Sequence, residues 1–446
     1  MIELTPEEKQ NPQKRPNFVL PIAIMFLLFF MIAFVTGYQN PLGSVIEKMS
    51  AGNPIMSQLG TLANFIAYAF MGYPAGMLLQ KKGYRVTALT AVTIGFIGVA
   101  VTYFSGWIDN DASAVVVYLI GAFIAGFSMC LLNTVVNPML NSLGSTPNQG
   151  NQLVQFGGAC NSLGATLAPV VVGGLLGGAA STISSANPVF FLAMAIFFVA
   201  FLVLYFSKLP ESPDLGKPQN KVKVANAFKY RNFTFGVLAI FCYVGLEVGL
   251  ANWTYQYLEK SELVATNNIN FEASAIAGTI CGIYWLLMLV GRLLGGVIGS
   301  KVSSRAMLIT ATLGAMAFII LGISLDQSIV PFFGFDSGNM LFEVVNVPLN
   351  SIFFVLCGFF ASIMWGAIFN LSVTGLGKYT PVASGIFMVM VCGGGIFPFL
   401  QGLIASSSII GSFWLPFALA AYIFLYALLL SRPSSSLPEE PEILEE

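Results

Sequence analysis

The sequence has no histidine and few charged residues: Asp, Glu, Lys and Arg make up 9% of its 446 residues. A soluble domain carries about 25%, so this chain cannot cover its own surface with polar groups in water. The absence of histidine excludes imidazole catalysis, imidazole metal ligands and a histidine proton relay. The six cysteines lie inside apolar segments and are interpreted as small hydrophobic side chains, so we expect no disulfide, metal site or cofactor.

The apolar residues come in long uninterrupted runs. No Asp, Glu, Lys or Arg occurs from Ala112 to Ser207, nor from Tyr379 to Ser431. A membrane-spanning helix needs about 20 mostly apolar residues, so each run holds more than one span, and the pattern does not fit the alternating strands of a barrel. The sequence predicts an all-α membrane protein with twelve spans, at 18–42, 57–79, 86–106, 114–138, 153–177, 188–207, 233–257, 273–300, 306–325, 351–373, 382–405 and 412–431.

The positive charges predict an orientation and a division into domains. Most of the nineteen Lys and Arg residues fall in the N-terminal tail, after the second, sixth and eighth spans, or after the last spans. Because such residues stay on the cytoplasmic side, we expect both termini in the cytoplasm and the protein in the cell (inner) membrane. The segment 208–231 would be a cytoplasmic linker between six-helix bundles at 1–207 and 232–432. The tail 433–446 is expected to be disordered, and 326–350 to be an external insert without assigned function.

The two predicted bundles carry the same residues at corresponding places. Asn137, which precedes Leu143-Gly144, recurs as Asn370 before Leu376-Gly377. The loop after the second span of each bundle also has a shared pattern, with Gly76, Lys81, Lys82, Gly83 and Arg85 in the first bundle and Gly296, Lys301 and Arg305 in the second. Parallel repeats of this kind are typical of transporters, and they predict two pseudo-symmetric copies of one six-helix unit.

The loop from Gly76 to Arg85 resembles the loop signature of the major facilitator superfamily, with Gln80 where the signature has an acidic residue. Other segments resemble the fucose permease branch, the fucose–galactose–glucose:proton symporters: Asn133 to Pro138, Asn161 to Gly164, Phe241 to Gly245, Gly291-Arg292 and Gly393 to Gly395. The resemblance implies the major facilitator fold and import of a monosaccharide or related sugar with a proton by alternating access. Two carboxylates associated with coupling in that branch are Asn40 and Asn133 here, so coupling through them does not carry over.

Two ionisable residues stand out inside the predicted spans, Glu247 and Arg292. Burying a charge in lipid is costly, so such residues are functional candidates. Glu247 is predicted to carry the coupling ion, and Arg292 to have a gating or structural role. Counting along their helices places them at depths that differ by roughly 10 Å, so the sequence does not require a salt bridge. A static polar contact between the helices is the alternative for Glu247.

Amide side chains both donate and accept, as sugar hydroxyl groups do, and aromatic rings suit the apolar faces of a sugar. The predicted substrate-binding residues are Gln39, Asn40, Asn133, Asn137, Gln155, Asn161, Trp253, Trp285, Trp365 and Asn370. For the amides, the alternative is hydrogen bonding between helices. For the tryptophans, it is packing or a place in the interfacial belt.

Other functions remain open at this point. The coupling ion could be a proton or sodium, the protein could be a uniporter, or it could export drugs or metabolites. A polytopic membrane enzyme is disfavoured, because Asp109-Asn110-Asp111 has metal–phosphate spacing but no supporting charged residues nearby. The chain has no Walker lysine loop, which argues against an ATP-driven pump. The expected partners are a small-molecule substrate, the coupling ion and the lipid bilayer, with no nucleic acid, and the protein is expected to be a monomer.

Overall fold

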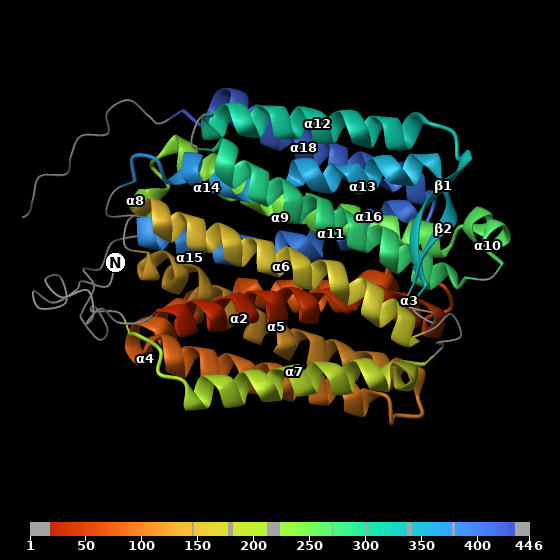
Figure 1. The fold of residues 1–446 in the computed structure, drawn as a ribbon, viewed down its shortest axis with the longest axis horizontal. Coiled ribbons are helices and arrows are strands. Elements are labelled where there is room, and N and C mark those ends of the chain that lie inside the picture. The colour runs from red at the N-terminus through yellow and green to blue at the C-terminus, as the bar shows by residue number, and fades with distance from the viewer. Residues whose placement is uncertain are drawn as a thin grey trace, which may run out of the picture.

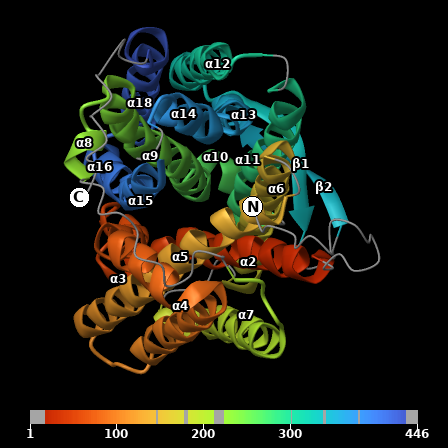
Figure 2. The same ribbon diagram turned by 90° about the vertical axis from the view of Figure 1, so that its left-hand side faces the viewer.

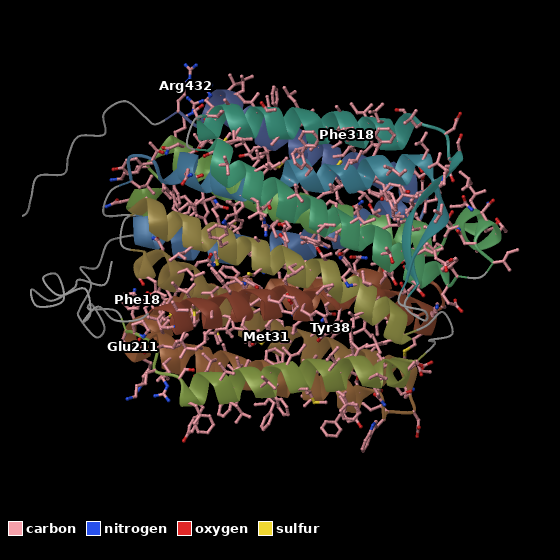
Figure 3. All side chains as sticks on the ribbon, viewed as in Figure 1. Phe18, Met31, Tyr38, Glu211, Phe318 and Arg432 are labelled. Atoms are coloured by element: carbon pink, nitrogen blue, oxygen red, sulfur yellow. The ribbon has the colours of Figure 1, made fainter. Side chains whose placement is uncertain are left out.

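The computed structural model describes residues 18–144, 147–176, 182–211, 224–269, 271–299, 302–336, 341–376 and 380–432. Long helices run side by side along one axis (Figure 1). Phe18, Glu211 and Arg432 lie at one end, which we call the terminal end (Figure 3). The short helix α10 (Glu262–Asn267) and a β-hairpin lie at the other, which we call the hairpin end. Lys301 and the tail 433–446 are outside the described residues.

The helices form two halves. The first contains α2 (Val19–Gly37), α3 (Gln39–Met49), η2 (Met56–Gln58), α4 (Leu59–Ser105), α5 (Asp111–Leu143), α6 (Pro147–Leu176), η3 (Ile183–Ala186) and α7 (Asn187–Phe206). The second contains α8 (Val224–Ala227), α9 (Arg231–Glu259), α10, α11 (Ala273–Ile298), α12 (Ser304–Ser324), α13 (Leu349–Ala361), α14 (Met364–Val373), α15 (Thr380–Met390), α16 (Gly393–Ala405), α17 (Ile409–Ser412), α18 (Trp414–Leu425) and η5 (Tyr426–Leu430). Figure 2, which looks at the terminal end, shows the halves as two groups, with α6 beside α11.

The described chain contains eleven segments long and apolar enough to cross a membrane. One of them, Met56–Ser105, has 50 residues, which would extend about 75 Å as a single helix. That is more than twice the roughly 30 Å hydrocarbon core. Its helix α4 is interrupted at Gly83, where φ is 81° and ψ is 179°, so it comprises two spans. The prediction of twelve spans in an all-helical membrane fold is therefore confirmed.

Each half has its own hydrophobic core, and the halves are in contact mainly along α6–α11, α4–α16 and α4–α15. In α11, a Cβ atom at Gly278 would lie 2.6 Å from the backbone oxygen of Pro169 in α6. In α16, a Cβ atom at Gly395 would lie 2.9 Å from the Cα atom of Leu62 in α4. Only glycine allows the backbones to approach so closely. The halves are thus in close contact along α6–α11 and α4–α16. The linker boundaries, 208–231, stay a prediction.

The repeated arginine of the loop pattern has the same contacts in both halves. Arg85 donates from Nε to the backbone oxygen of Leu204 at 3.4 Å and from Nη2 to that of Tyr205, near the end of α7. Arg305 donates from Nε to the backbone oxygen of Ala427 at 2.9 Å and from Nη2 to that of Leu428, in η5. Carbonyl groups in the last turn of a helix lack their usual partners. Each arginine therefore caps the last helix of its own half.

The structure adds one β-hairpin to the predicted helices, inside the segment 326–350. Strands β1 (Ile329–Asp336) and β2 (Leu341–Pro348) pair antiparallel. Val345 faces the core of the second half and is buried. The side chain of Asn268, after α10, donates to the backbone oxygen of Asn346 and accepts from its N–H, both at 2.8 Å. These two bonds continue the β-ladder and fix the hairpin to α10.

Candidate functional site

Glu247 of α9 and Arg292 of α11 form a salt bridge, with Nη2 3.2 Å from Oε1. The side chains are 12% and 15% exposed, so the pair is largely shielded. The predicted depth difference did not prevent their contact, because α9 and α11 are neighbours and both side chains are long. A shielded ion pair leaves a large penalty if either partner loses its charge alone, which makes it sensitive to protonation.

Two tyrosines lie beside Glu247. Tyr243, one turn earlier in α9, is fully buried, and its ring centroid lies 6.1 Å from that of Trp365 in α14. Tyr284 of α11 donates its hydroxyl to the backbone oxygen of Glu247 at 3.1 Å. Sequence reasoning missed both, because a tyrosine in an apolar span resembles ordinary packing. The four-residue spacing between Tyr243 and Glu247, which places them on one helix face, is the signal that could have found Tyr243.

Arg292 also reaches the first half. Its Nη1 donates to the backbone oxygen of Gly158 and to the hydroxyl of Ser162 in α6, each at 2.9 Å. Gln155 lies one turn before Gly158, and its Nε2 is 3.7 Å from the place a Cβ atom would take at Gly366, beside Trp365. The structure therefore brings the predicted residues Gln155, Trp365, Glu247 and Arg292 to one place, where α6, α9, α11 and α14 meet.

A second polar cluster lies in the first half. The Asn133 side chain donates from Nδ2 to the hydroxyl of Tyr68 at 3.0 Å and to the backbone oxygen of Met129 at 3.1 Å. Asn137 donates to the backbone oxygen of Asn133 at 3.0 Å, and both asparagines are partly buried. The ring of Tyr68, missed from the sequence, stacks on Phe65. Phe65 packs against α16, so this cluster lies close to the contact between the halves.

Two other predicted amides form hydrogen bonds within the first half. The Oε1 atom of Gln39 accepts from the hydroxyl of Tyr118 at 2.6 Å, and Gln39 is buried. Asn161 donates to the backbone oxygen of Phe29 in α2 at 3.1 Å. These contacts correspond to the alternative of hydrogen bonding between helices. The side chain of Asn40 is outside the described residues.

The remaining predicted ligands lie in the second half. Trp253 is fully buried and donates from Nε1 to the backbone oxygen of Pro398 at 2.9 Å. Trp285 is partly buried and packs edge-on against Tyr284, with centroids 5.2 Å apart. Asn370 is exposed, near the terminal end of α14. Packing accounts for the contacts of Trp253, while Trp285 is next to the tyrosine that binds the backbone of Glu247.

The loop pattern of the first half is organised around Gly83. The carboxylate of Glu211 accepts from the backbone N–H groups of Tyr84 at 2.6 Å and Arg85 at 3.0 Å. These are among the first N–H groups of the second part of α4, which carry a partial positive charge. The carboxylate that binds this loop therefore comes from Glu211, which is distant in sequence, although Gln80 occupies the acidic position of the signature.

The other residues of the loop pattern lie on open surface. Lys81 and Lys82 are exposed, and a Cβ atom at Gly76 or Gly296 would meet no atom within 4 Å. Nothing in these surroundings requires glycine at the two positions.

At the hairpin end, polar side chains join the two halves. The ammonium group of Lys260 lies 2.7 and 2.6 Å from the two carboxylate oxygens of Glu47 in α3. The amide of Gln256 donates to the hydroxyl of Ser44 at 3.0 Å, and that hydroxyl donates to Glu259. These α3–α9 contacts cross from one half to the other.

A further contact lies deeper, where Asn252 of α9 donates to the side-chain oxygen of Gln58 at 2.9 Å. Both side chains are buried. The halves are therefore closed against each other at the hairpin end.

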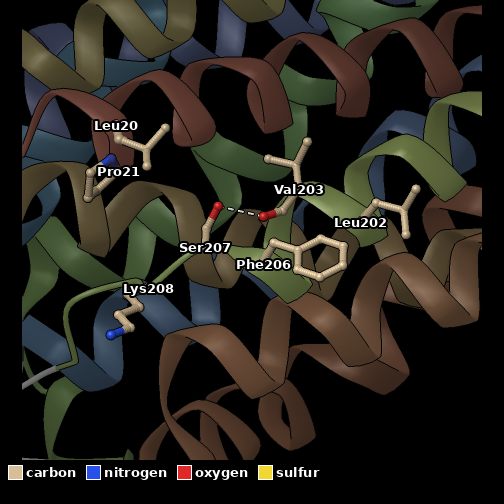
Figure 4. A pocket seen from close by; sticks show the side chains of 7 residues that line it. All are labelled: Leu20, Pro21, Leu202, Val203, Phe206, Ser207 and Lys208. Atoms are coloured by element: carbon tan, nitrogen blue, oxygen red, sulfur yellow. Dashed lines mark hydrogen bonds between the residues drawn. The ribbon is translucent and has the colours of Figure 1, made fainter.

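A pocket at the terminal end lies within the first half (Figure 4). It is lined by residues of α2 and of the end of α7, namely Leu20, Pro21, Leu202, Val203, Phe206, Ser207 and Lys208. The hydroxyl of Ser207 donates to the backbone oxygen of Val203. No predicted binding residue lines this pocket, so it does not bear on the site around Glu247.

Twelve spans in two similar halves, meeting around a shielded ion pair, define a polytopic membrane carrier. The chain belongs to the major facilitator superfamily, whose family model matches residues 22–398. The superfamily indicated by the loop pattern is therefore confirmed.

Relatives within that superfamily include sugar transporters. The chain is 27% identical to the glucose/galactose transporter of Brucella abortus (strain 9-941) over 430 residues, which cover 93% of this chain and 95% of that protein. It is 23% identical to the L-fucose-proton symporter of Escherichia coli K12, over 96% of this chain and 97% of the symporter. These relatives agree with the branch that the motifs indicated.

Among solved structures, the fold is similar to that of the transporter FucP in the outward conformation. The TM-score is 0.66 at 21% identity, and the match covers 93% of this chain and 99% of FucP. A D-xylose-proton symporter matches with a TM-score of 0.62 at 15% identity, over 93% of this chain and 97% of the symporter. Both share the major facilitator fold with this chain.

Proposed function

We propose that this protein imports a monosaccharide or related sugar together with a proton, by alternating access, across the inner membrane. Both termini lie in the cytoplasm, so the terminal end faces inward and the hairpin end faces outward. Glu247 carries the proton, and no step requires the protein to act as an enzyme. The names of its relatives support the substrate class, since they include glucose/galactose and L-fucose transporters.

The observation that carries this proposal is the salt bridge between Glu247 and Arg292 beside the contact between the halves. An ionisable pair in a membrane interior is expensive to maintain, and it lies where alternating access moves one half against the other. Protonation of Glu247 removes its charge and leaves the guanidinium of Arg292 without an anionic partner. The free-energy cost of the unpaired guanidinium depends on how the halves are arranged. Protonation of Glu247 is thereby coupled to the conformation of the protein.

The sugar binds between the halves, on amide and aromatic side chains of the two polar clusters, one around Arg292 and one around Tyr68. Gln155 and Trp365 provide an amide and a ring on one side, and Asn133 with Asn137 provides amides on the other. Tyr68, hydrogen-bonded to Asn133, adds a hydroxyl group that both donates and accepts. This arrangement suits a neutral polyhydroxylated ring better than the apolar or cationic compounds that drug exporters carry.

The test is transport in proteoliposomes with an imposed proton gradient and labelled glucose, galactose and fucose. Glu247→Gln keeps the shape of the side chain but cannot take up or release a proton. We expect the variant to lose accumulation and to retain counterflow exchange. Glu272→Gln, the same change at an exposed residue before α11, is the control and should accumulate sugar normally. Accumulation by Glu247→Gln at the wild-type level would rule out Glu247 as the proton carrier.

The same vesicles distinguish the other coupling modes. A sodium gradient without a proton gradient should drive no accumulation if a proton is the coupled ion. Accumulation driven by sodium alone would establish a sodium-coupled carrier. Equilibration without accumulation under both gradients would establish a uniporter.

A further inference from the structure

The guanidinium of Arg292 connects three helices from two halves. It projects from α11 and binds Glu247 of α9 through Nη2, both in the second half. Through Nη1 it binds Gly158 and Ser162 of α6, in the first half. Among its acceptors, only Glu247 can carry a charge. The arginine is therefore shared between the proton-carrying residue of one half and a helix of the other.

The geometry of the guanidinium links these contacts. The group is planar and rigid, and its N–H donors cannot be turned independently. Two acceptors on α6 at 2.9 Å hold Nη1 and so fix the direction in which Nη2 points, toward Oε1 of Glu247 at 3.2 Å. A shift of α6 along α11 must change the direction of Nη2.

Ser162 is the side chain in this contact that the first half contributes. It is fully buried, and its hydroxyl accepts from Nη1 while retaining its own proton to donate. Gly158 contributes only a backbone oxygen, which substitution does not remove. A substitution at Ser162 therefore changes the hydrogen bonding between α6 and Arg292 without changing Arg292 or Glu247.

We propose that Ser162 is a positioning residue for proton coupling, which holds Arg292 against Glu247 while the hairpin end is closed. This inference rests on the proposed function. The held guanidinium stabilises the ionised carboxylate, so the proton leaves Glu247 toward the terminal end in this conformation. When the hairpin end opens and α6 moves, Arg292 is released from α6, and Glu247 accepts a proton from the outer side.

The groups that face Glu247 support this assignment. The titratable side chains around its carboxylate are Arg292 and Tyr284 from α11 and Tyr243 from α9 itself. Among them, Arg292 is the positively charged group, and it is the group that the first half holds. Movement of the first half therefore changes the position of Arg292, and the position of Arg292 changes how strongly Glu247 binds its proton.

The experiment compares the pH dependence of sugar counterflow in Ser162→Ala, Ser162→Thr and Ser128→Ala. Removing the Ser162 hydroxyl loosens Arg292, so Glu247 holds its proton to higher pH. We expect the midpoint of the Ser162→Ala profile to move upward by about one pH unit, the size expected for one hydrogen bond to a charged group. Ser162→Thr keeps the hydroxyl and should restore the wild-type midpoint.

Ser128→Ala is the matched control, since Ser128 is also a fully buried serine of the first half, and it lies beside Gly95 of α4 rather than beside Arg292. Its midpoint should equal that of the wild type. An unchanged midpoint in Ser162→Ala overturns the inference, and so does an equal shift in Ser128→Ala. If Ser162→Ala does not fold, Ser162→Cys takes its place, because the thiol is only a weak hydrogen-bond acceptor. The midpoint of the Ser162→Cys profile must then move upward, and a wild-type midpoint in that variant overturns the inference.

The outcome is separable from the test of the proposed function. If Glu247→Gln accumulates sugar, the proposed function fails whatever the serine variants do. If Glu247→Gln loses accumulation while Ser162→Ala titrates like the wild type, only the role of Ser162 is refuted.

Discussion

Lys260 at the end of α9 and Glu47 in α3 form a salt bridge between the two halves, in which Nζ lies 2.6 and 2.7 Å from the two carboxylate oxygens. Glu47 is 8% exposed and Lys260 is 29% exposed at the side chain. The pair therefore holds the hairpin end closed at a place where opening must break it. Under alternating access, such a contact stabilises one conformation and leaves the other unaffected.

Reversing one charge of this pair should favour opening at the hairpin end. Glu47→Lys or Lys260→Glu alone places like charges together and should destabilise the closed state by about 1 kcal/mol or more. Distances between spin labels on α3 and α10 should then lengthen. The double reversal Glu47→Lys with Lys260→Glu restores the attraction and should return the distances to wild-type values. Equal distances in the single and double variants would show that the pair does not hold the halves.

The arginine caps should contribute equally to the two halves. Arg85→Ala and Arg305→Ala each remove hydrogen bonds between a charged donor and the last turn of a helix, worth about 1.5–3 kcal/mol. We expect both variants to lower the midpoint of thermal unfolding in detergent by similar amounts. Lysine cannot reach two carbonyls with one rigid fork, so Arg85→Lys and Arg305→Lys should recover only part of the loss. A large effect in one half and none in the other would mean that the repeat is not functionally symmetric.

The twelve spans were predictable because each depends on a local property, the length of an apolar run. Their division at Gly83 was also predictable, since the charged loop around it interrupts the pattern. The hairpin was not, because its strands depend on packing against α11 and on the side chain of Asn268. Those partners are distant in sequence. The alternation of apolar and polar residues within a short insert is too weak a signal to predict the two strands.

For the site, the sequence identified Glu247 and Arg292 because charge is conspicuous in an apolar span. It did not place them in contact, since counting residues gives height along one helix and ignores side-chain reach. Ser162 and Tyr68 were missed for a different reason. A serine or tyrosine is unremarkable in a membrane helix until a partner from another helix is seen to bind it.

Gly83 should be intolerant of any side chain. Its φ of 81° with a ψ of 179° lies in a backbone region essentially restricted to glycine, which other residues adopt only at a cost of about 1–3 kcal/mol. A Cβ atom there would also lie 2.3 Å from Oε2 of Glu211 and displace the carboxylate that caps α4. Gly83→Ala should therefore lower the thermal unfolding midpoint. Gly76→Ala is the control, because its Cβ would meet no neighbour, and alanine is favoured over glycine in a helix. A loss of stability in Gly76→Ala equal to that in Gly83→Ala would contradict this account.

Asn133 and Asn161 should respond differently to truncation, although the sequence placed both in the substrate site. The side chain of Asn133 is partly buried and shares its amide with the hydroxyl of Tyr68, near the contact between the halves. The amide of Asn161 is used to bind the backbone of Phe29 in the same half. Asn133→Ala should therefore weaken sugar binding by about tenfold, the equivalent of roughly 1.4 kcal/mol, with little loss of stability.

Asn161→Ala should instead lower the unfolding midpoint, because it leaves a buried carbonyl without its second partner, and the affinity of the folded protein should stay near that of the wild type. Isothermal titration with sugar, together with thermal unfolding of the same samples, separates the two effects. Tyr68→Phe should weaken binding in the same direction as Asn133→Ala, since it removes the hydroxyl but keeps the ring stacked on Phe65. If Asn161→Ala loses affinity and Asn133→Ala does not, the sugar lies against α2 and α6 rather than against α4 and α5.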